Sequence, residues 1–231
     1  MKDQPAGPLA TAPAEWSEVE RLFGVRGEPS RCWCRYFALP GPEFSALDPA
    51  SRKAQLKKKF DGGAPSPGVL AYRDGEPVGW CAVEPRACYP RVLRSQLLRL
   101  AEPARPDAGT DNVGTDNVGT KDSGTKYTGG AEAGNPADLW SVTCFVVAAG
   151  HRRSGVAAAL LQAAVEHARL HGATVLEGYP VDPSQRPKAG AADLYHGTLN
   201  LFMQAGFRVV SATVPGRAVV RLRLDGGSDS S

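Results

Sequence analysis

The sequence predicts a mixed α/β fold, in which a mostly antiparallel sheet contains one central parallel strand–helix–strand unit and helices cover both faces. The first observation is the Asp-Gly pair at 74–75, a strong hairpin signal between two strand-like runs. The second is an apolar strand that leads through a glycine turn into an amphipathic helix and then into another apolar strand. The third is a pair of short strand-like runs near the C-terminal end.

The first half of the chain contains the predicted hairpin and three flanking elements. Cys32–Leu39 is rich in aromatic residues and predicts a strand, and Arg52–Phe60 predicts a short basic helix. The hairpin strands are Val69–Tyr72 and Pro77–Val83. After a loop, Val92–Leu100 predicts a second short helix.

The second half is more regular and contains the parallel unit. Leu139–Val147 is dense in β-branched and aromatic residues without clean alternation, which is typical of a strand covered on both faces. The next helix carries apolar residues at helical spacing from Val156 onward and stops at Gly172. Because Thr174–Val181 is another strand of the buried type, the three elements predict a right-handed crossover between parallel strands.

The predicted domain ends with one more helix and an antiparallel pair of strands. Tyr195–Ala205 predicts the helix, with Gly206 as its stop, and Phe207–Thr213 and Ala218–Leu224 predict the strands. Together these elements predict a single domain over residues 30–224.

Three segments are predicted to lack a fixed structure. Residues 1–29 form a flexible N-terminal extension that begins with a Pro-, Ala- and Gly-rich stretch, and residues 225–231 form a flexible tail. The third is a low-complexity insertion at about 101–138, where Gly-Thr-Asp-Asn-Val occurs twice in tandem. It has too few apolar residues to offset the ordering of its backbone, which costs about 1–2 kcal/mol per residue. We therefore expect it to be disordered.

The composition is that of a soluble globular protein and excludes several classes. Hydrophobic residues make up 42% of the 231 and charged residues 22%, and no apolar run approaches the roughly 20 residues of a membrane span. A net charge of +3 is too small for a nucleic-acid-binding face. The first residues lack the apolar core of a secretory signal, and the five cysteines have no metal-ligand spacing. We therefore expect a cytoplasmic protein with reduced thiols, no metal and no membrane or nucleic-acid partner.

The turn between the strand and the helix of the second half carries the clearest chemical signal. Gly155 lets the backbone turn tightly, and the first N–H groups of the helix have no intrahelical partner. The helix dipole favours a phosphate at this end, where His151, Arg152 and Arg153 add cationic side chains. The turn by itself also fits an ordinary strand-to-helix connection with solvated arginines.

The context of this turn resembles a known family. Arg-x-x-Gly-x-Ala at 152–157, after an apolar strand, resembles motif A of the GNAT N-acetyltransferase superfamily. The hairpin resembles the family's second and third strands, and the stretch LFMQAGF at 201–207 resembles the family's junction between its fourth helix and sixth strand, so the order of elements also matches. The resemblance covers most of 30–224 and implies the GNAT fold and an acyl-CoA co-substrate, most often acetyl-CoA.

The same resemblance implies which residues hold acetyl-CoA. The backbone amides that would hold the pyrophosphate belong to Arg152, Arg153, Ser154, Gly155, Val156 and Ala157. The strand backbone that would pair with the pantetheine belongs to Phe145, Val146 and Val147, where the two parallel strands of the family splay apart.

The catalytic residues are less clearly indicated, because the tyrosine that often serves as general acid in the family falls at Phe202. Glu177 is the leading candidate for a base, since a carboxylate inside an apolar strand has a raised pKa or an ion pair. Its alternative role is that of a structural partner to an arginine. Tyr195 and His196 are the alternative acid and base.

Three functions fit these residues. The first is an enzyme that transfers an acetyl group from acetyl-CoA to a primary amine of a small molecule, by direct attack in a ternary complex. The second is acetylation of a protein lysine or N-terminus, and the third is an acyl-CoA-binding module with weak or no catalysis, which Phe202 favours. We expect the first, in a monomer or homodimer, because positioning and a proton path supply much of the rate of acyl transfer to an amine.

Overall fold

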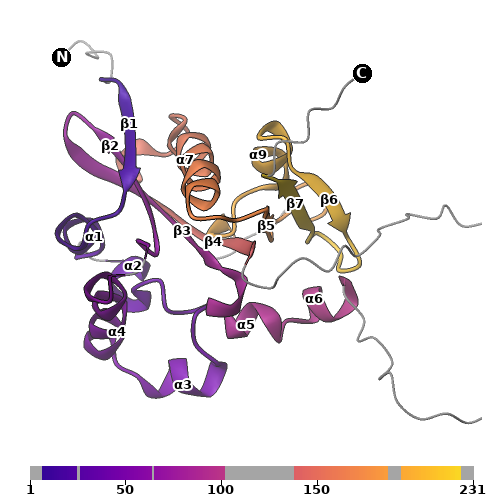
Figure 1. The fold of residues 1–231 in the computed structure, drawn as a ribbon, viewed down its shortest axis with the longest axis horizontal. Coiled ribbons are helices and arrows are strands. Elements are labelled where there is room, and N and C mark those ends of the chain that lie inside the picture. The colour runs from indigo at the N-terminus through magenta and orange to yellow at the C-terminus, as the bar shows by residue number, and fades with distance from the viewer. Residues whose placement is uncertain (1–6, 25–26, 64, 102–137, 187–193, 225–231) are drawn as a thin grey trace, which may run out of the picture.

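The computed structural model describes the chain except for residues 1–6, 25–26, 64, 102–137, 187–193 and 225–231 (Figure 1). The strands of the described part are β1 (Leu9–Pro13), β2 (Gly68–Arg73), β3 (Glu76–Pro85), β4 (Leu139–Val147), β5 (Val175–Gly178), β6 (Arg208–Ser211) and β7 (Val219–Arg223). Its α-helices are α1 (Trp16–Phe23), α2 (Glu28–Cys32), α3 (Gly41–Ala46), α4 (Pro49–Asp61), α5 (Pro90–Leu93), α6 (Gln96–Ala101), α7 (Val156–Leu170) and α9 (Leu199–Gln204). Two short 3₁₀ helices are η1 (Arg86–Cys88) and η3 (Ala149–His151).

The strands form one sheet in the order β1-β2-β3-β4-β5-β7-β6. Only the β4–β5 pair is parallel among the neighbours in this sheet, and the other neighbours pair antiparallel. The mixed, mostly antiparallel sheet with a central parallel unit is therefore confirmed.

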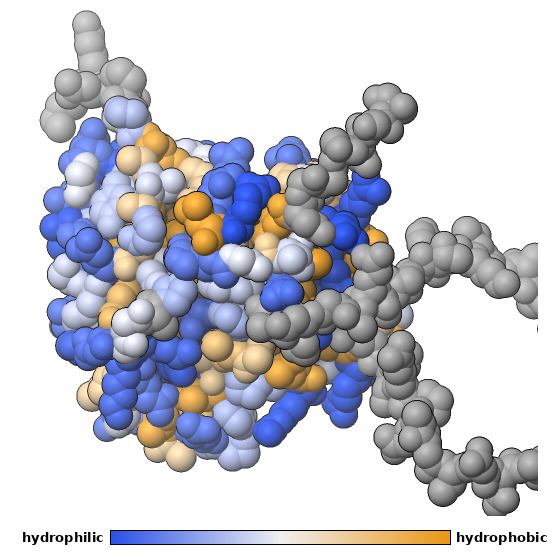
Figure 2. Space-filling model, in the orientation of Figure 1, coloured by the Kyte–Doolittle hydropathy of each residue, from blue (hydrophilic) through white to orange (hydrophobic). Residues whose placement is uncertain are grey.

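Helices cover both faces of the sheet. Because successive side chains along a strand point to opposite faces, one strand contributes to the cores on both faces. On β2, Val69 and Ala71 join the core beneath α7, which also contains Phe202 of α9. Leu70 and Tyr72 lie in the core on the other face, with α1, α2 and α4 (Figure 1). On the surface seen in Figure 2, apolar side chains are interspersed among hydrophilic ones.

The prediction of a flexible extension over residues 1–29 is wrong for much of that range. Residues 9–13 form β1, which pairs antiparallel with β2 at the edge of the sheet. The helix α1 packs its apolar side into the core through Val19, Leu22 and Phe23. Small residues and prolines hide β1 from a hydrophobic pattern, because an edge strand needs few apolar side chains.

Two other predicted elements are also wrong in place or type. Cys32–Leu39 is not a strand. Its first residue ends α2, the next two, Trp33 and Cys34, have positive φ angles (47° and 52°), and turns follow. The helix predicted from Tyr195 begins only at Leu199, where the Thr198 hydroxyl caps it by accepting from the Leu201 N–H at 3.4 Å. Tyr195 and His196 therefore lie in the segment that precedes the helix.

The helix predicted over Val92–Leu100 is divided into α5 and α6 by a break at residues 94–95. The other predicted strands and helices are confirmed to within a few residues, among them β4, whose bounds match the prediction. The predicted low-complexity insertion and the tail lie outside the described residues, apart from the ends of the insertion. Within the described part, no helix has the length and apolar character that a membrane span requires.

Candidate active site

The candidate site begins where β4 and β5 diverge. The two strands pair only between 139–142 and 175–178, so the end of β4 has no β5 partner on that edge. The Phe145 N–H points to the open edge and donates to the Tyr195 carbonyl at 2.7 Å. Because backbone groups alternate between the two edges of a strand, Val147 faces the same side and the Val146 backbone faces β3, opposite Trp80. The prediction that Val146 offers its backbone to a ligand is therefore wrong, whereas Phe145 and Val147 face the open edge.

The turn before α7 presents free backbone amides. Gly155 has φ +84° and Arg153 has φ +60°, so the chain makes a left-handed turn into the helix. The Ser154 hydroxyl donates to the His151 carbonyl at 2.7 Å, which holds this turn. The first intrahelical bond runs from the Ala159 N–H to the Gly155 carbonyl. The N–H groups before Ala159 therefore lack intrahelical acceptors and form an anion-binding end.

A cavity of about 690 Å³, here called the groove, connects this turn to the open edge of β4. The predicted residues that line it are Phe145, Val146, Val147, Arg152, Ala157 and Tyr195. Arg153, Ser154 and Gly155 are exposed beside it, and Val156 is buried under the turn. The structure thus brings together both halves of the predicted acyl-CoA site.

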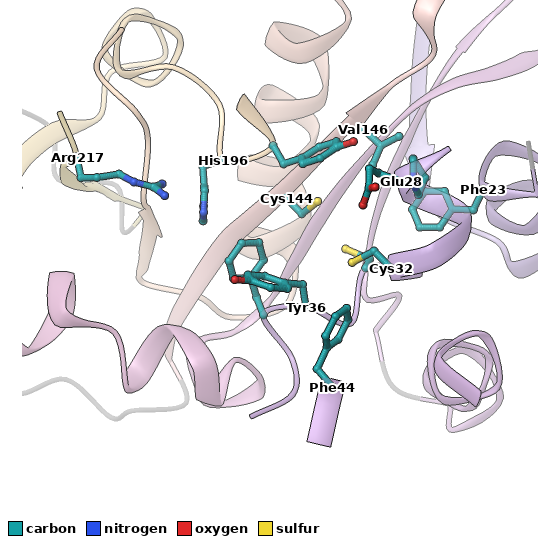
Figure 3. Close-up of a pocket in the computed structure, with 13 residues that line it drawn as sticks. Phe23, Glu28, Cys32, Tyr36, Phe44, Cys144, Val146, His196 and Arg217 are labelled. Atoms are coloured by element: carbon teal, nitrogen blue, oxygen red, sulfur yellow. The ribbon is translucent and has the colours of Figure 1, made fainter. Parts of the chain in front are cut away.

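A second cavity of about 400 Å³, here called the aromatic cavity, adjoins the groove on the α2 side of the sheet (Figure 3). Its aromatic residues are Phe23, Tyr36, Phe37, Phe44 and Tyr195. Its other lining residues are Glu28, Pro29, Cys32, Cys34, Cys144, Val146, His196 and Arg217. Both cavities are lined by Glu28, Pro29, Val146 and Tyr195, which therefore form the junction between them.

The structure brings one of the three predicted catalytic side chains, Tyr195, to this junction and a second, His196, to the aromatic cavity. Tyr195 lines both cavities, and His196 lines the aromatic cavity with its ring 4.6 Å from that of Phe37. Burial raises the pKa of the Tyr195 phenol above its ordinary value. This phenol therefore stays protonated at neutral pH and has a proton to donate.

The third, Glu177, lies elsewhere. It is fully buried on β5, and its carboxylate accepts from Arg221 Nε at 2.7 Å, from Arg86 at 3.4 Å and from the Tyr179 hydroxyl at 2.6 Å. The Tyr179 hydroxyl also lies 2.8 Å from the Ser141 hydroxyl on β4. Glu177 lines neither cavity described above, so its geometry favours the structural alternative that its sequence position left open.

Sequence reasoning missed a thiol cluster in the aromatic cavity. Trp80 Nε1–H donates to the Cys34 Sγ at 3.3 Å, and the Cys144 thiol also donates to it. The hydrogen bond from Cys144 has the larger effect in lowering the pKa of the Cys34 thiol, and the hydrogen bond from Trp80 lowers it further. Burial raises the pKa of the neighbouring Cys32 to about 11. The short spacing of Cys32 and Cys34 was visible in the sequence, but the approach of Cys144 depends on the fold.

Sequence reasoning also missed Glu28. It begins α2, two residues after a stretch that the structure does not describe, and no motif marks it. It is the one acidic side chain among the described residues that line the aromatic cavity. Among the described residues, this cavity included, no group of three or more His, Cys, Asp or Glu side chains is placed to hold a metal ion.

The chain matches one family model and is similar in fold to solved structures. Residues 33–197 match the model of the Acetyltransferase (GNAT) family. The solved structure of yncA, a putative acetyltransferase from Salmonella typhimurium with acetyl-CoA, aligns over 96% of this chain and 98% of its own with a TM-score of 0.50 and 13% identity. An N-acetyltransferase from Staphylococcus aureus Mu50 aligns over 94% and 99% (TM-score 0.48, 11% identity). A GCN5-related N-acetyltransferase from Kribbella flavida aligns over 94% and 98% (TM-score 0.46, 16% identity). The search of curated proteins finds no significant match.

Proposed function

Because the chain belongs to the GNAT acetyltransferase family, we propose that it transfers the acetyl group of acetyl-CoA to a primary amine of a small molecule. The observation that carries the proposal is the junction, where a groove with an anion-binding end meets a separate, smaller cavity. Two cavities with a shared wall suit direct attack in a ternary complex, since both reactants are held side by side.

The residues along the groove fit acetyl-CoA, which supplies a thioester-linked acetyl group when it is bound. The unpaired amides at the start of α7 and the cationic Arg152 suit the pyrophosphate. The open edge of β4 at Phe145 and Val147 suits the amides of the pantetheine. The Phe145 N–H already donates to Tyr195, so Val147 offers the more accessible backbone groups.

The proton transfers are assigned to side chains at the junction. Tyr195 takes the place of the family's usual acid, because Phe202 is fully buried against Phe145 and Phe207 and has no hydroxyl. The protonated phenol of Tyr195 donates its proton to the departing thiolate of CoA. On the amine side, Glu28 at the junction accepts the proton that the amine must lose, and His196 in the aromatic cavity is the alternative acceptor. Glu177 is left out of this scheme because Arg221, Arg86 and Tyr179 enclose its carboxylate.

The small volume of the aromatic cavity supports a small acceptor over a protein lysine or N-terminus, because about 400 Å³ holds a ligand of drug size. The binding-module alternative retains one supporting observation, the buried Phe202 in place of the usual acid. It predicts acetyl-CoA affinity without turnover.

Calorimetry with acetyl-CoA and thiol release over a panel of primary amines test the proposal. We expect saturable acetyl-CoA binding and amine-dependent thiol release. Tyr195→Phe should lower kcat by roughly a hundredfold and keep acetyl-CoA affinity within a few-fold, because only the hydroxyl is removed. Tyr72→Phe on β2, outside both cavities, is the matched control. Binding without turnover on any amine would overturn the proposal and support the binding module.

A further inference from the structure

The wall of the aromatic cavity is built from rings that come from separate segments. Phe23 ends α1, Tyr36 and Phe37 lie in the turns after α2, Phe44 belongs to α3 and Tyr195 precedes α9. Figure 3 shows Tyr36 and Phe44 on one side of the cavity, across from Cys144 and His196 on the other. Rings from so many segments favour a ligand with a large apolar surface.

Two of these rings, Tyr36 and Phe44, are held in place by arginines. The Arg91 guanidinium lies 4.0 Å from the Tyr36 ring centroid and donates to the Leu39 carbonyl at 3.2 Å. The Arg52 guanidinium lies 3.9 Å from the Phe44 ring centroid and donates to the Phe44 carbonyl at 2.8 Å. The two rings also meet edge to face at 5.4 Å. The cavity is therefore preorganised, so a ligand does not have to order its walls.

The charges around the cavity are arranged with a direction. Glu28 lies at the junction with the groove, and Arg217 lies at the opposite end (Figure 3). Glu28 forms an ion pair with Arg31 of the same helix at 3.9 Å, and this pair is weak because both side chains are exposed. The Glu28 side chain is 64% exposed, so its carboxylate is accessible to a ligand. An ammonium group is attracted to the Glu28 end.

We infer that the acceptor is a small primary amine on an aromatic or similarly flat apolar body, with its ammonium group on Glu28 and its body in the aromatic cavity. This inference rests on the proposed acetyl transfer, because it places the nitrogen at the junction where the acetyl group would be delivered. Glu28 is then a specificity-determining residue, which selects a cationic head group. The rings select the body that carries it.

The experiment measures binding directly, by calorimetry in the presence of CoA, so that it does not depend on turnover. The probes are 2-phenylethylamine, its neutral analogue 2-phenylethanol, and n-propylamine, which lacks the ring. We expect 2-phenylethylamine to bind at least tenfold more tightly than either of the others. Glu28→Gln should weaken 2-phenylethylamine about tenfold and leave 2-phenylethanol unchanged. Glu43→Gln, an exposed carboxylate of α3 outside both cavities, should change neither.

The outcomes separate this inference from the proposed function. Equal binding of 2-phenylethylamine and n-propylamine, or an unchanged affinity in a folded Glu28→Gln variant, overturns the inference even if other amines are acetylated. The predicted binding preferences without thiol release from any amine support the inference and overturn the proposed acetyl transfer. A melting curve for each variant shows that the comparison is between folded proteins.

Discussion

The sharpest test of the cofactor site is Gly155→Glu at the start of α7. Gly155 has φ +84°, and a Cβ added there meets no atom within 4 Å. The substitution is therefore not blocked by space, and its cost to folding comes from the left-handed backbone, about 1–2 kcal/mol. That cost falls on the free energy of unfolding, and it does not by itself change affinity for a ligand.

The effect on CoA affinity has a different origin, the new negative charge beside the amides that are proposed to hold the pyrophosphate. Two like charges roughly 6 Å apart repel by about 0.7 kcal/mol in water and about 3 kcal/mol at an effective dielectric constant of 20. Residues 152–155 are exposed, so the lower part of this range applies to each phosphate charge. Two phosphate charges give at least about 1.4 kcal/mol, which is a tenfold loss of CoA affinity or more.

Calorimetry with CoA measures the affinity, and thermal melting measures stability. Gly172→Glu is the matched control, because Gly172 lies at the other end of α7 with φ +82° and also has no atom within 4 Å of an added Cβ. It should lose stability to a similar extent and keep wild-type CoA affinity. Gly155→Ala adds backbone strain without charge, so its CoA affinity should stay within a few-fold of the wild-type value. A folded Gly155→Glu variant with wild-type CoA affinity would show that the pyrophosphate does not bind at this turn.

Three further predictions concern buried polar groups. Glu177→Gln should lower the free energy of unfolding by about 3 kcal/mol, because it breaks a buried ion pair with Arg221. Turnover per folded molecule should stay unchanged. A hundredfold loss of turnover at unchanged Tm would refute the structural role of Glu177. Burial lowers the pKa of His167 below its ordinary 6.5, so its contribution to stability is present above that pH and is lost as the pH falls through the lowered pKa. In a His167→Gln variant, Tm should therefore fall less steeply than in the wild type as the pH is lowered. An equally steep fall would contradict this role of His167. Iodoacetamide should alkylate Cys34 before Cys32, as read by peptide mass spectrometry, and 2-phenylethylamine should protect it; equal labelling would count against the lowered pKa of the Cys34 thiol.

The elements that the sequence predicts well are those whose signals are local. The Asp-Gly pair requires positive φ at both turn positions, and Asp74 and Gly75 have φ values of 53° and 78°. β4 is recognisable because it is buried over most of its length and is therefore mostly apolar, with Ser141 and Thr143 as its polar residues. In both cases the residues that make the signal are the residues that form the structure.

The elements that the sequence does not reveal depend on distant partners. β1 is held by backbone pairing with β2, from Leu9 opposite Arg73 to Pro13 opposite Val69, so its own side chains carry little pattern. The aromatic cavity likewise joins Phe23, Phe44 and Tyr195, which are far apart in the chain. Local periodicity contains no information about such a meeting, so the acceptor side of the site could not be predicted.

Glu177 and Glu28 show why burial alone is a poor guide to a catalytic carboxylate. A carboxylate in an apolar strand must be neutralised, and the strand register decides how. The register of β5 with β7 places Arg221 opposite Glu177, so the protein itself supplies the counter-charge. Arg221, Arg86 and Tyr179 donate to this carboxylate, which lines neither cavity and so does not face a substrate there. Glu28 is exposed at a junction of two cavities and its ion pair with Arg31 is weak, so its carboxylate stays accessible, which is the condition that a substrate-binding carboxylate has to meet.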